Sequence, residues 1–378
     1  MKATKVVKNF SEIYEREYEM HFVELLRFVG GGAWNITVKR ARENDTGKVD
    51  FRVTLGHPSV DEAVEFLVET KPLPRPSQLR FREFGERYLE KNPGRIVVPV
   101  LAAPFISDRI ADLCEKHGWS WFDLSGNCRI KVADVIYIER TGAKAVYKQP
   151  RPLANLSTAA SARVLRALLA PQNAGRIWTQ TKLKRHCEDH NCGVSFGLIN
   201  KVIGHLRDQA YVEDRDDGFI VSDPVELLES WGKAYRFDRY RRVNCFTLLK
   251  SRVLEDRLEG LNGSICRAAF AVFSAADHQA PSVRQNKAWF FVNEGGLDEF
   301  IHAVEAKRVD TGENLVVFVP DDDGVFYLGD VGTGRGLPCT NPVQTWLDLI
   351  SVGGRGEEAA EALMGQCLKP RWKGLSDA

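Results

Sequence analysis

The sequence predicts an α/β plus α+β protein of three domains, at residues 1–149, 150–223 and 224–378. Three observations support this prediction. Strand-like and helical segments alternate over residues 1–149, which is typical of a mixed sheet flanked by helices. Residues 150–223 contain three apolar stripes at helical spacing and then a hairpin signal. Residues 224–378 mix helices with separate strands, and a length of 378 residues suits two or three domains.

The composition is that of an ordinary soluble globular protein, with 44% hydrophobic and 27% charged residues. The net charge is +1, so a nucleic-acid surface would have to be local. No apolar run approaches the roughly 18 residues that span a membrane, and the first ten residues lack the apolar core of a signal peptide. We therefore expect a cytoplasmic protein that does not contact a membrane.

The eight cysteines are scattered, and no Cys-x-x-Cys pair is present. Paired cysteines are the usual signature of structural zinc, so a zinc site is not expected. Cys187, His190 and Cys192 lie close together in the sequence, but no second cluster of ligands accompanies them. We expect these thiols to be reduced and packed.

The N-terminal domain is expected to begin with a helix that Ser11 caps and that ends at Gly30. Strands and helices then alternate along the chain. The predicted strands are 34–40, 48–55, 64–70, 95–102, 119–123 and 128–139, and the predicted helices are 76–89 and 108–117. Residues 123–127 are either a hairpin turn or polar groups at the rim of a nucleic-acid site.

One pattern in this domain could carry chemistry. Asp50 begins a strand, Glu69 and Lys71 share one side of a later strand, and Gln78 starts the next helix. Carboxylate oxygens suit Mg²⁺, which would activate water for attack on a phosphodiester while a lysine stabilises the developing charge. Asp50 and Glu69 are therefore the candidate metal ligands, and Asp50, Glu69, Lys71 and Gln78 are the candidate catalytic residues.

These residues resemble the core of PD-(D/E)XK nucleases, which have a restriction-endonuclease-like mixed sheet. The resemblance implies that an acid of the first helix, Glu15 or Glu19, completes the site. The sequence departs from the family pattern because Val49, and not proline, precedes Asp50. Glu-x-Lys is also common on solvated strand faces, and a nuclease fold can persist without its chemistry.

The central segment predicts three helices, at residues 160–170, after Thr179 and after Ser195, with both of these residues as N-caps. Asp217-Gly218 is a hairpin turn signal. Helices followed by a β-hairpin are the winged helix-turn-helix pattern, whose third helix fits the major groove of DNA. The same module can also serve protein contacts alone.

Nine residues of this module are candidates for DNA contact. From Arg176 to Arg207 the chain carries six Lys or Arg against two acids, which is a modest phosphate-binding charge. The hairpin is acidic, so its tip should stay away from phosphates. His186 is expected to point outward with the basic residues of its helix. The candidates are Thr179, Lys182, Lys184, Arg185, Ser195, Phe196, Asn200, Lys201 and Arg207.

The C-terminal domain should contain helices at 224–235, 248–258, 267–276, 297–304, 343–350 and 356–367, and strands at 288–293, 315–319 and 326–328. Basic and aromatic residues alternate over 236–242, either as a nucleic-acid contact or as a packed ridge with a solvated face. The glycine-rich stretch 332–336 lacks the Lys-Ser/Thr of a phosphate loop.

Several phrases resemble AbiEi-type antitoxins of type IV toxin–antitoxin systems. They are residues 98–107 (VPVLAAPFIS), 122–127 (FDLSGN), 194–202 (VSFGLINKV), 342–349 (PVQTWLDL) and 354–360 (GRGEEAA). The resemblance implies a transcriptional repressor that binds promoter DNA, with a nucleotidyltransferase-like toxin encoded beside it. Many such antitoxins begin with the winged helix, whereas here it is internal.

Two functions remain open at this stage. The first is a non-enzymatic regulator, antitoxin-like, that binds duplex DNA through the central module and needs no cofactor. The second is a Mg²⁺-dependent endonuclease that the same module targets to DNA. A homodimer is compatible with either function. A nucleotidyltransferase gene next to this one would favour the regulator.

Overall fold

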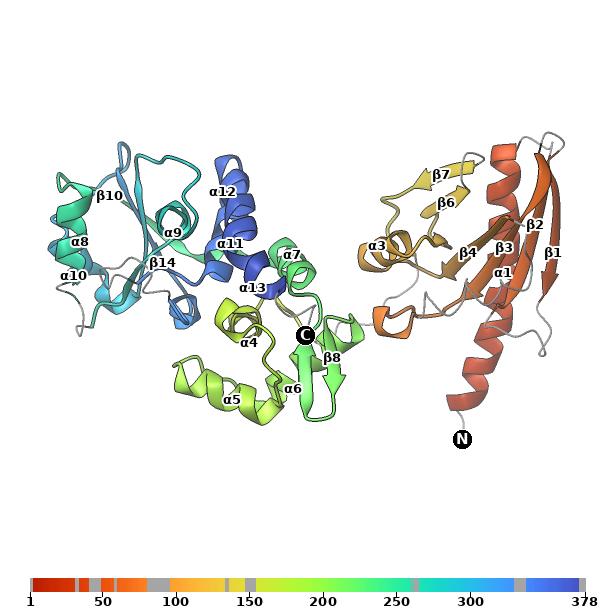
Figure 1. Ribbon diagram of the computed structural model, residues 1–378, viewed down its shortest axis with the longest axis horizontal. Coiled ribbons are helices and arrows are strands. Elements are labelled where there is room, and N and C mark those ends of the chain that lie inside the picture. The colour runs from red at the N-terminus through yellow and green to blue at the C-terminus, as the bar shows by residue number, and fades with distance from the viewer. Residues whose placement is uncertain are drawn as a thin grey trace. The chain divides into compact units, whose positions relative to one another are not determined.

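The computed structural model describes residues 3–30, 34–40, 49–57, 60–79, 96–132, 136–146, 154–259, 261, 265–329 and 338–373. The chain forms two compact units, Met1–Arg151 and Pro152–Ala378 (Figure 1). Within the described ranges, no helix is long and apolar enough to cross a membrane.

The first unit is a seven-stranded sheet with helices. Its strands lie side by side in chain order, from β1 to β7. Neighbouring strands are antiparallel, except that β4 is parallel to both β3 and β5. The elements are α1 Ala3–Gly30, β1 Asn35–Arg40, β2 Phe51–His57, β3 Val60–Thr70, η1 Pro76–Gln78, β4 Ile96–Ala103, α3 Asp108–Lys116, β5 Ser120–Asp123, β6 Cys128–Val132 and β7 Ile136–Arg140.

The two faces of this sheet pack against different helices because successive side chains of a strand point to opposite sides. On one face, Phe66 and Val100 join a core with Phe22 of α1, and Figure 1 shows α1 running along the sheet. On the other face, Leu101 packs with Ile110 of α3. The period-two pattern therefore fixes which strand residues face α1.

Two sequence predictions in this unit were wrong, and a third is tested only at its first residues. The first helix begins at Ala3, so Ser11 lies inside it and is no cap. The single predicted strand 128–139 is two antiparallel strands, β6 and β7. The segment from Pro76 begins as the 3₁₀ helix η1, and the rest of the predicted helix lies outside the described residues. Ser107 does precede α3, although its side chain makes no cap hydrogen bond.

The second unit begins with the three predicted helices and the predicted hairpin. These elements are α4 Ala159–Leu169, η2 Pro171–Asn173, α5 Gln180–Asp189, α6 Phe196–Asp208, β8 Val212–Arg215 and β9 Gly218–Val221. Gly218 has a φ of 155°. A Cβ there would lie 2.2 Å from the Trp178 carbonyl oxygen, so only glycine lets the hairpin approach α5 this closely.

The remainder of this unit is built on a five-stranded sheet of order β11-β12-β14-β10-β13. Its elements are α7 Pro224–Ala234, η3 Phe237–Arg239, β10 Arg241–Phe246, α8 Ser251–Glu259, β11 Ala268–Phe270, α9 Val272–Gln279, β12 Ala288–Val292, η4 Glu294–Gly296, α10 Leu297–Ala303, β13 Lys307–Arg308, β14 Leu315–Val319, η5 Asp323–Phe326, α11 Pro342–Val352, α12 Arg355–Leu363, the π turn η6 Met364–Leu368 and α13 Lys369–Lys373.

Two predictions in this part were wrong. The predicted helix 267–276 is strand β11 followed by α9, because β11 pairs with β12 and small residues suit both structures. The predicted strand 326–328 is the end of η5 and a turn. Residues 332–336 lie outside the described residues.

Helices cover both faces of the five-stranded sheet (Figure 1). Phe290 packs with residues of α8 and α10. Its neighbour Phe291 points to the other side, into a core formed with α9 and α11 that continues into α4, α5 and α6. The predicted domain boundary at residue 223 stays a prediction, but one hydrophobic core extends across it.

Candidate nucleic-acid interface and acidic cluster

The predicted caps of α5 and α6 are confirmed. The Thr179 hydroxyl accepts a hydrogen bond from the Lys182 amide at 3.1 Å, and the Ser195 hydroxyl accepts one from the Leu198 amide at 3.3 Å. Each bond satisfies an amide that the helix start would otherwise leave open. Thr179 and Ser195 therefore set where the two helices begin, whatever else they contact.

The outer face of α6 is exposed at its N-terminal end. Its inner residues, among them Ile199, Val202 and Leu206, are fully buried. Phe196, by contrast, is 47% exposed, and Asn200 and Lys201 are exposed as well. The Asn200 amide oxygen accepts a hydrogen bond from Gln180 at 3.2 Å. This end of α6 presents one aromatic, one amide and one cationic side chain to the surroundings.

The basic candidates fall into two groups. Lys184 pairs with Glu188 of its own helix and lies over the Phe196 ring. Arg207 pairs with Asp214 of the hairpin, at 2.7 Å. A carboxylate therefore already neutralises each of these two charges in the protein. Arg207 links α6 to the hairpin through this pair.

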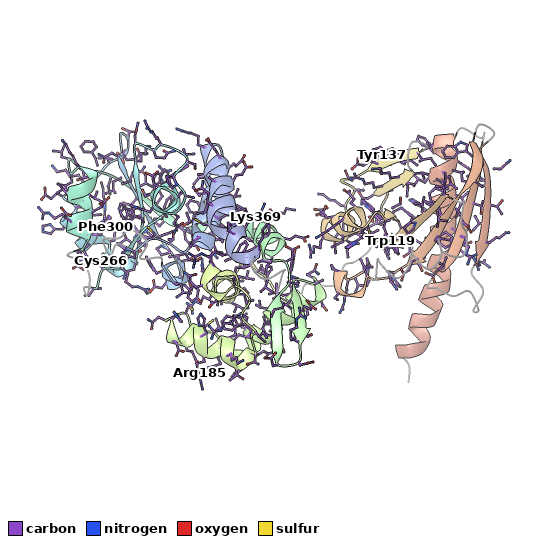
Figure 2. All side chains as sticks on the ribbon, viewed as in Figure 1. Trp119, Tyr137, Arg185, Cys266, Phe300 and Lys369 are labelled. Carbon is purple, nitrogen blue, oxygen red and sulfur yellow. The ribbon has the colours of Figure 1, made fainter. Side chains whose placement is uncertain are left out.

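Lys182, Arg185 and Lys201 form the second group. They are exposed and make no ion pair within the described part of the chain. Figure 2 shows Arg185 projecting outward from α5. These three charges remain available to an anionic partner.

The hairpin tip carries exposed acids, Asp216 and Asp217, as the sequence indicates. Its one arginine, Arg215, pairs with Glu213 at 3.1 Å. The hairpin is therefore negatively charged beyond its contact with Arg207.

His186 was expected to point outward and is instead only 9% exposed. Its Nε2 hydrogen-bonds the hydroxyl of Tyr327, which follows η5 more than a hundred residues later. Burial, together with the neighbouring charges of His190 and Arg176, lowers the pKa of His186 to about 4. Helical periodicity could not predict the burial of His186, because its partner Tyr327 lies far along the sequence.

Cys187 and Cys192 are buried and unbridged. The hydrogen bond between the two thiols and their burial raise the pKa of Cys187. In the described ranges, no three His, Cys, Asp or Glu side chains are grouped so as to hold a metal ion.

Asp50 lies at the same end of the β2–β3 pair as the neighbouring residues Glu69 and Lys71. The Asp50 amide donates to the Val68 carbonyl at 2.9 Å, which sets Asp50 beside the end of β3. Its Oδ2 accepts hydrogen bonds from the Thr70 amide at 2.6 Å and the Thr70 hydroxyl at 2.8 Å. Glu69 is 9% exposed and pairs with Lys71 at 2.7 Å, as the period of two predicts.

Of the other expected members, Glu19 is the one whose side chain the structure describes. Glu19 pairs with Arg40 of β1, at 2.7 Å. The side chains of Glu15 and Gln78 lie outside the described residues. Among the side chains that the structure describes, two carboxylates and one lysine therefore make up the acidic cluster.

The Asp123 turn is a self-contained hydrogen-bonded unit. Its Oδ1 accepts from the amides of Ser125 and Asn127, and its Oδ2 accepts from the Ile106 amide and the Asn127 side chain, all within 3.1 Å. Asp123 is fully buried. These bonds favour the hairpin-turn interpretation over a nucleic-acid contact.

The sequence analysis did not identify a group of three consecutive aspartates that form ion pairs. Each of them pairs with an arginine from a different element. The pairs are Asp321 with Arg239 at 3.6 Å, Asp322 with Arg163 at 2.5 Å, and Asp323 with Arg267 at 3.3 Å. The run Asp-Asp-Asp was visible in the sequence, but its partners are distant residues.

Fold and sites together define a mixed α/β protein that bears a capped, basic helix pair and a separate acidic cluster. A family model described as "Transcriptional regulator, AbiEi antitoxin, Type IV TA system" matches residues 220–369. The match is to less than half of the chain; it includes the five-stranded sheet and ends at Lys369, the first residue of α13. It indicates an antitoxin or transcriptional-regulator role. No curated protein and no solved structure matches the chain.

Proposed function

We propose that the protein is a transcriptional regulator, antitoxin-like, that binds duplex DNA through α5 and α6. In this proposal α4, α5, α6 and the β8–β9 hairpin act as a winged helix-turn-helix module, with α6 in the major groove. The observation that carries the proposal is the N-terminal end of α6, where Phe196, Asn200 and Lys201 are exposed on a helix whose other face is buried.

The types of these side chains suit base and phosphate contacts. An amide such as that of Asn200 can read adenine, and an apolar ring such as that of Phe196 can contact a thymine methyl. Lys182, Arg185 and Lys201 have no ion-pair partner among the described residues and are the proposed phosphate contacts. The acidic hairpin supports an approach through the helices and away from the hairpin tip.

The test is a titration of labelled duplex from the protein's own promoter by fluorescence anisotropy at several salt concentrations. Lys201→Ala should weaken binding and reduce the slope of log K against log salt by about 0.9, which is one phosphate contact. Lys307→Ala, which removes an exposed lysine on β13, is the matched control and should change neither quantity. If wild-type protein shows no salt-dependent binding to this duplex, the proposal fails.

Arg207→Ala separates two roles of that side chain. The ion pair with Asp214 predicts a loss of stability at the α6–hairpin junction. If Arg207 also contacts DNA, the salt slope should fall as well.

A nucleotidyltransferase-like toxin is the proposed protein partner, because the matched family belongs to type IV toxin–antitoxin systems. Co-expression with the product of a neighbouring nucleotidyltransferase gene should relieve its toxicity. Unchanged toxicity with soluble regulator present would exclude this partnership.

A second candidate function is a Mg²⁺-dependent endonuclease at Asp50, Glu69 and Lys71. It is favoured by the position of Asp50 next to Glu69 and Thr70, and by an antiparallel β1–β3 meander followed by the parallel β4. The donor set fits one Mg²⁺, because Asp50 Oδ1 and the Glu69 carboxylate are hard oxygen ligands. A bound Mg²⁺ would supply Lewis-acid activation of water and phosphodiester, while Lys71 holds the Glu69 side chain.

Strand breaks on the same duplex test this candidate. An endonuclease predicts cleavage that needs Mg²⁺ and is lost in Glu69→Gln but kept in Asp112→Asn, an exposed acid of α3. If the duplex is bound but stays intact, the endonuclease is excluded and the regulator remains as the proposed function.

A further inference from the structure

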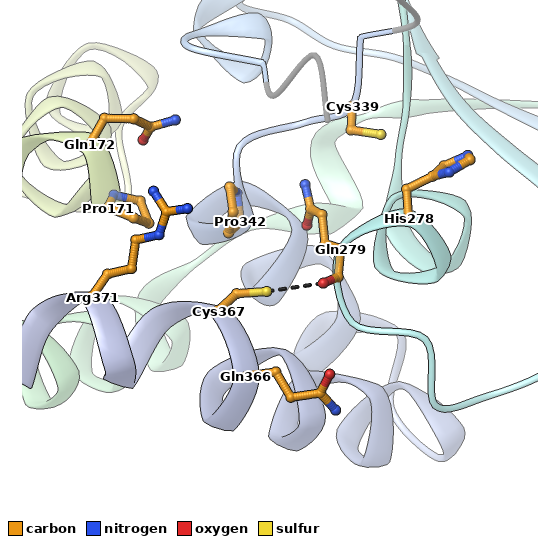
Figure 3. Close-up of a pocket in the computed structure, with 9 residues that line it drawn as sticks. All are labelled: Pro171, Gln172, His278, Gln279, Cys339, Pro342, Gln366, Cys367 and Arg371. Carbon is orange, nitrogen blue, oxygen red and sulfur yellow. Dashed lines mark hydrogen bonds between the residues drawn. The ribbon is translucent and has the colours of Figure 1, made fainter. Parts of the chain in front are cut away.

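A pocket of about 210 Å³ lies in the second unit, where η2 meets α9, α11, η6 and α13 (Figure 3). Its lining includes Pro171, His278, Gln279, Cys367 and Arg371. The volume is below that of a drug-sized site and suits a ligand of few atoms.

The described lining of the pocket carries positive charge and no negative charge. Among the lining residues that the structure describes, Arg371 carries the only permanent charge and none is acidic. Within the described part of the chain, Arg371 makes no ion pair. In Figure 3 its guanidinium lies beside Pro171, and Pro342 is drawn between it and Gln279. An unpaired guanidinium with its planar fork of donors is suited to a carboxylate or a phosphate.

Gln279 adds a second requirement. Its Nε2 donates to the Thr340 carbonyl at 2.6 Å, so the orientation of the amide is set. Its Oε1 is buried and has no hydrogen-bond partner among the described residues. A buried acceptor without a donor costs about 1–3 kcal/mol in general, and a ligand hydroxyl would satisfy it. The pocket therefore offers donors for an anion and an acceptor for an O–H group.

The wall that carries Arg371 is held by specific contacts. The π turn η6 connects α12 to α13, and such π turns are frequent at functional sites. The Cys367 thiol in this turn donates to the Gln279 carbonyl at 3.1 Å. One helical turn later, Arg371 projects from α13 beside the pocket. The π turn thus fixes the position of Arg371 relative to Gln279.

The pocket is also connected to the proposed DNA-binding helices. Trp372, next to Arg371, donates from Nε1 to the Leu169 carbonyl at the end of α4, at 3.2 Å. Pro171 of the lining follows α4 after a single residue. A ligand that binds Arg371 would therefore affect the C-terminal end of α4, which Trp372 contacts.

We propose that this pocket is a binding site for a small hydroxylated anion, a phosphomonoester or a hydroxycarboxylate, with Arg371 binding the anionic group and Gln279 Oε1 accepting from its hydroxyl. The ligand would change the affinity of the protein for DNA through α13 and α4; this last step rests on the proposed function, whereas the site itself does not.

Calorimetric titration of the full chain tests the site without DNA. The probes are inorganic phosphate, glycerol 3-phosphate and malate, with glycerol as the uncharged control. At least one anion should bind with a Kd of about 1 mM or tighter. Arg371→Gln should weaken that binding about tenfold or more, and Arg371→Lys should be intermediate because it keeps the charge and loses the fork. Lys373→Gln, which removes a neighbouring exposed charge on α13, should bind like the wild type.

The outcomes separately test the existence of the site, the class of ligand and the coupling to DNA binding. If no anion binds the folded wild type, or if Arg371→Gln binds as well as Lys373→Gln, the site is refuted. If glycerol 3-phosphate binds and malate does not, the ligand is a phosphomonoester, and the reverse identifies a hydroxycarboxylate. A DNA titration with and without the binding anion then tests the coupling: a shift that Arg371→Gln abolishes supports it, and an unchanged affinity refutes it. Failure of DNA binding altogether would refute the proposed function and leave the calorimetric result standing.

Discussion

Asp348 should make the second unit less stable as the pH rises through neutrality. The side chain lies on α11 with no exposed surface. Its Oδ1 accepts hydrogen bonds from the Tyr235 hydroxyl at 2.9 Å and from Gln344 Nε2 at 2.7 Å, while its Oδ2 has no partner among the described residues. Burial raises the pKa of this carboxyl from 3.8 to about 8, against the opposing effect of its two hydrogen bonds and of Arg166.

The sign follows from proton binding in the two states. Above a pH of about 4 the unfolded chain ionises this carboxyl, whereas the folded protein keeps it protonated up to about pH 8. Stability therefore falls with rising pH over this range and levels off above it. Each pKa unit is worth about 1.4 kcal/mol, so the slope is on the order of 1 kcal/mol per pH unit near neutrality.

Asp348→Asn is the perturbation that isolates this effect, because asparagine has the shape of the neutral acid and cannot ionise. As the pH rises from about 6.5 to about 8, we expect the free energy of unfolding of the variant to increase relative to that of the wild type by about 1–2 kcal/mol. Urea unfolding at several pH values, followed by tryptophan fluorescence, measures this difference. Glu357→Gln, an exposed acid on α12, should keep the wild-type slope.

The opposite result would refute this reasoning. If Arg166, which is also buried, held Asp348 in its ionised form, Asp348→Asn would leave an uncompensated guanidinium. The variant would then lose about 3–5 kcal/mol at every pH, and its stability would follow the pH dependence of the wild type.

Three further predictions concern stability and use the same unfolding assay. Because burial lowers the pKa of His186 to about 4, the folded state should lose stability as the pH falls from 6.5 toward 4, and His186→Gln should remove part of this acid sensitivity. Asp322→Ala breaks a half-buried pair and the cap of η5 and should cost about 2 kcal/mol, whereas Asp323→Ala breaks an exposed pair and should cost less than about 1 kcal/mol. Gly356→Ala should destabilise by about 1–3 kcal/mol, since its Cβ would lie 2.2 Å from the Leu349 carbonyl oxygen. Gly365→Ala, with open space around the Cβ, should be neutral or slightly stabilising; equal losses in the two glycine variants would show that close packing is not the cause.

Helices with a cap and an apolar stripe were the most predictable part of the fold. Thr179 and Ser195 each cap the helix that follows, as predicted, and the buried residues of α6 and α7 match the apolar stripes. The prediction for residues 267–276 failed because alanines carry no period, so pairing of β11 with β12 decided the structure.

The candidate sites were predictable to different degrees. The period of two identified Glu69 and Lys71 as neighbours, and pairing of β2 with β3 brought Asp50 beside them. At the proposed DNA face the sequence supplied the list of basic residues. It could not separate Lys201 from Arg207, because Asp214, the partner of Arg207, lies on the hairpin.

The sequence by itself determined the local features of this protein: where helices start, which faces are apolar, and where the charged residues are. These follow from interactions within a few residues, which periodicity and capping describe. Tertiary structure alone decided which charges are neutralised, that His186 and Asp348 are buried, and that Arg371 and Gln279 share a pocket. Such properties depend on partners far away in the chain, whose proximity lowers the local dielectric and excludes water, and no local pattern encodes them.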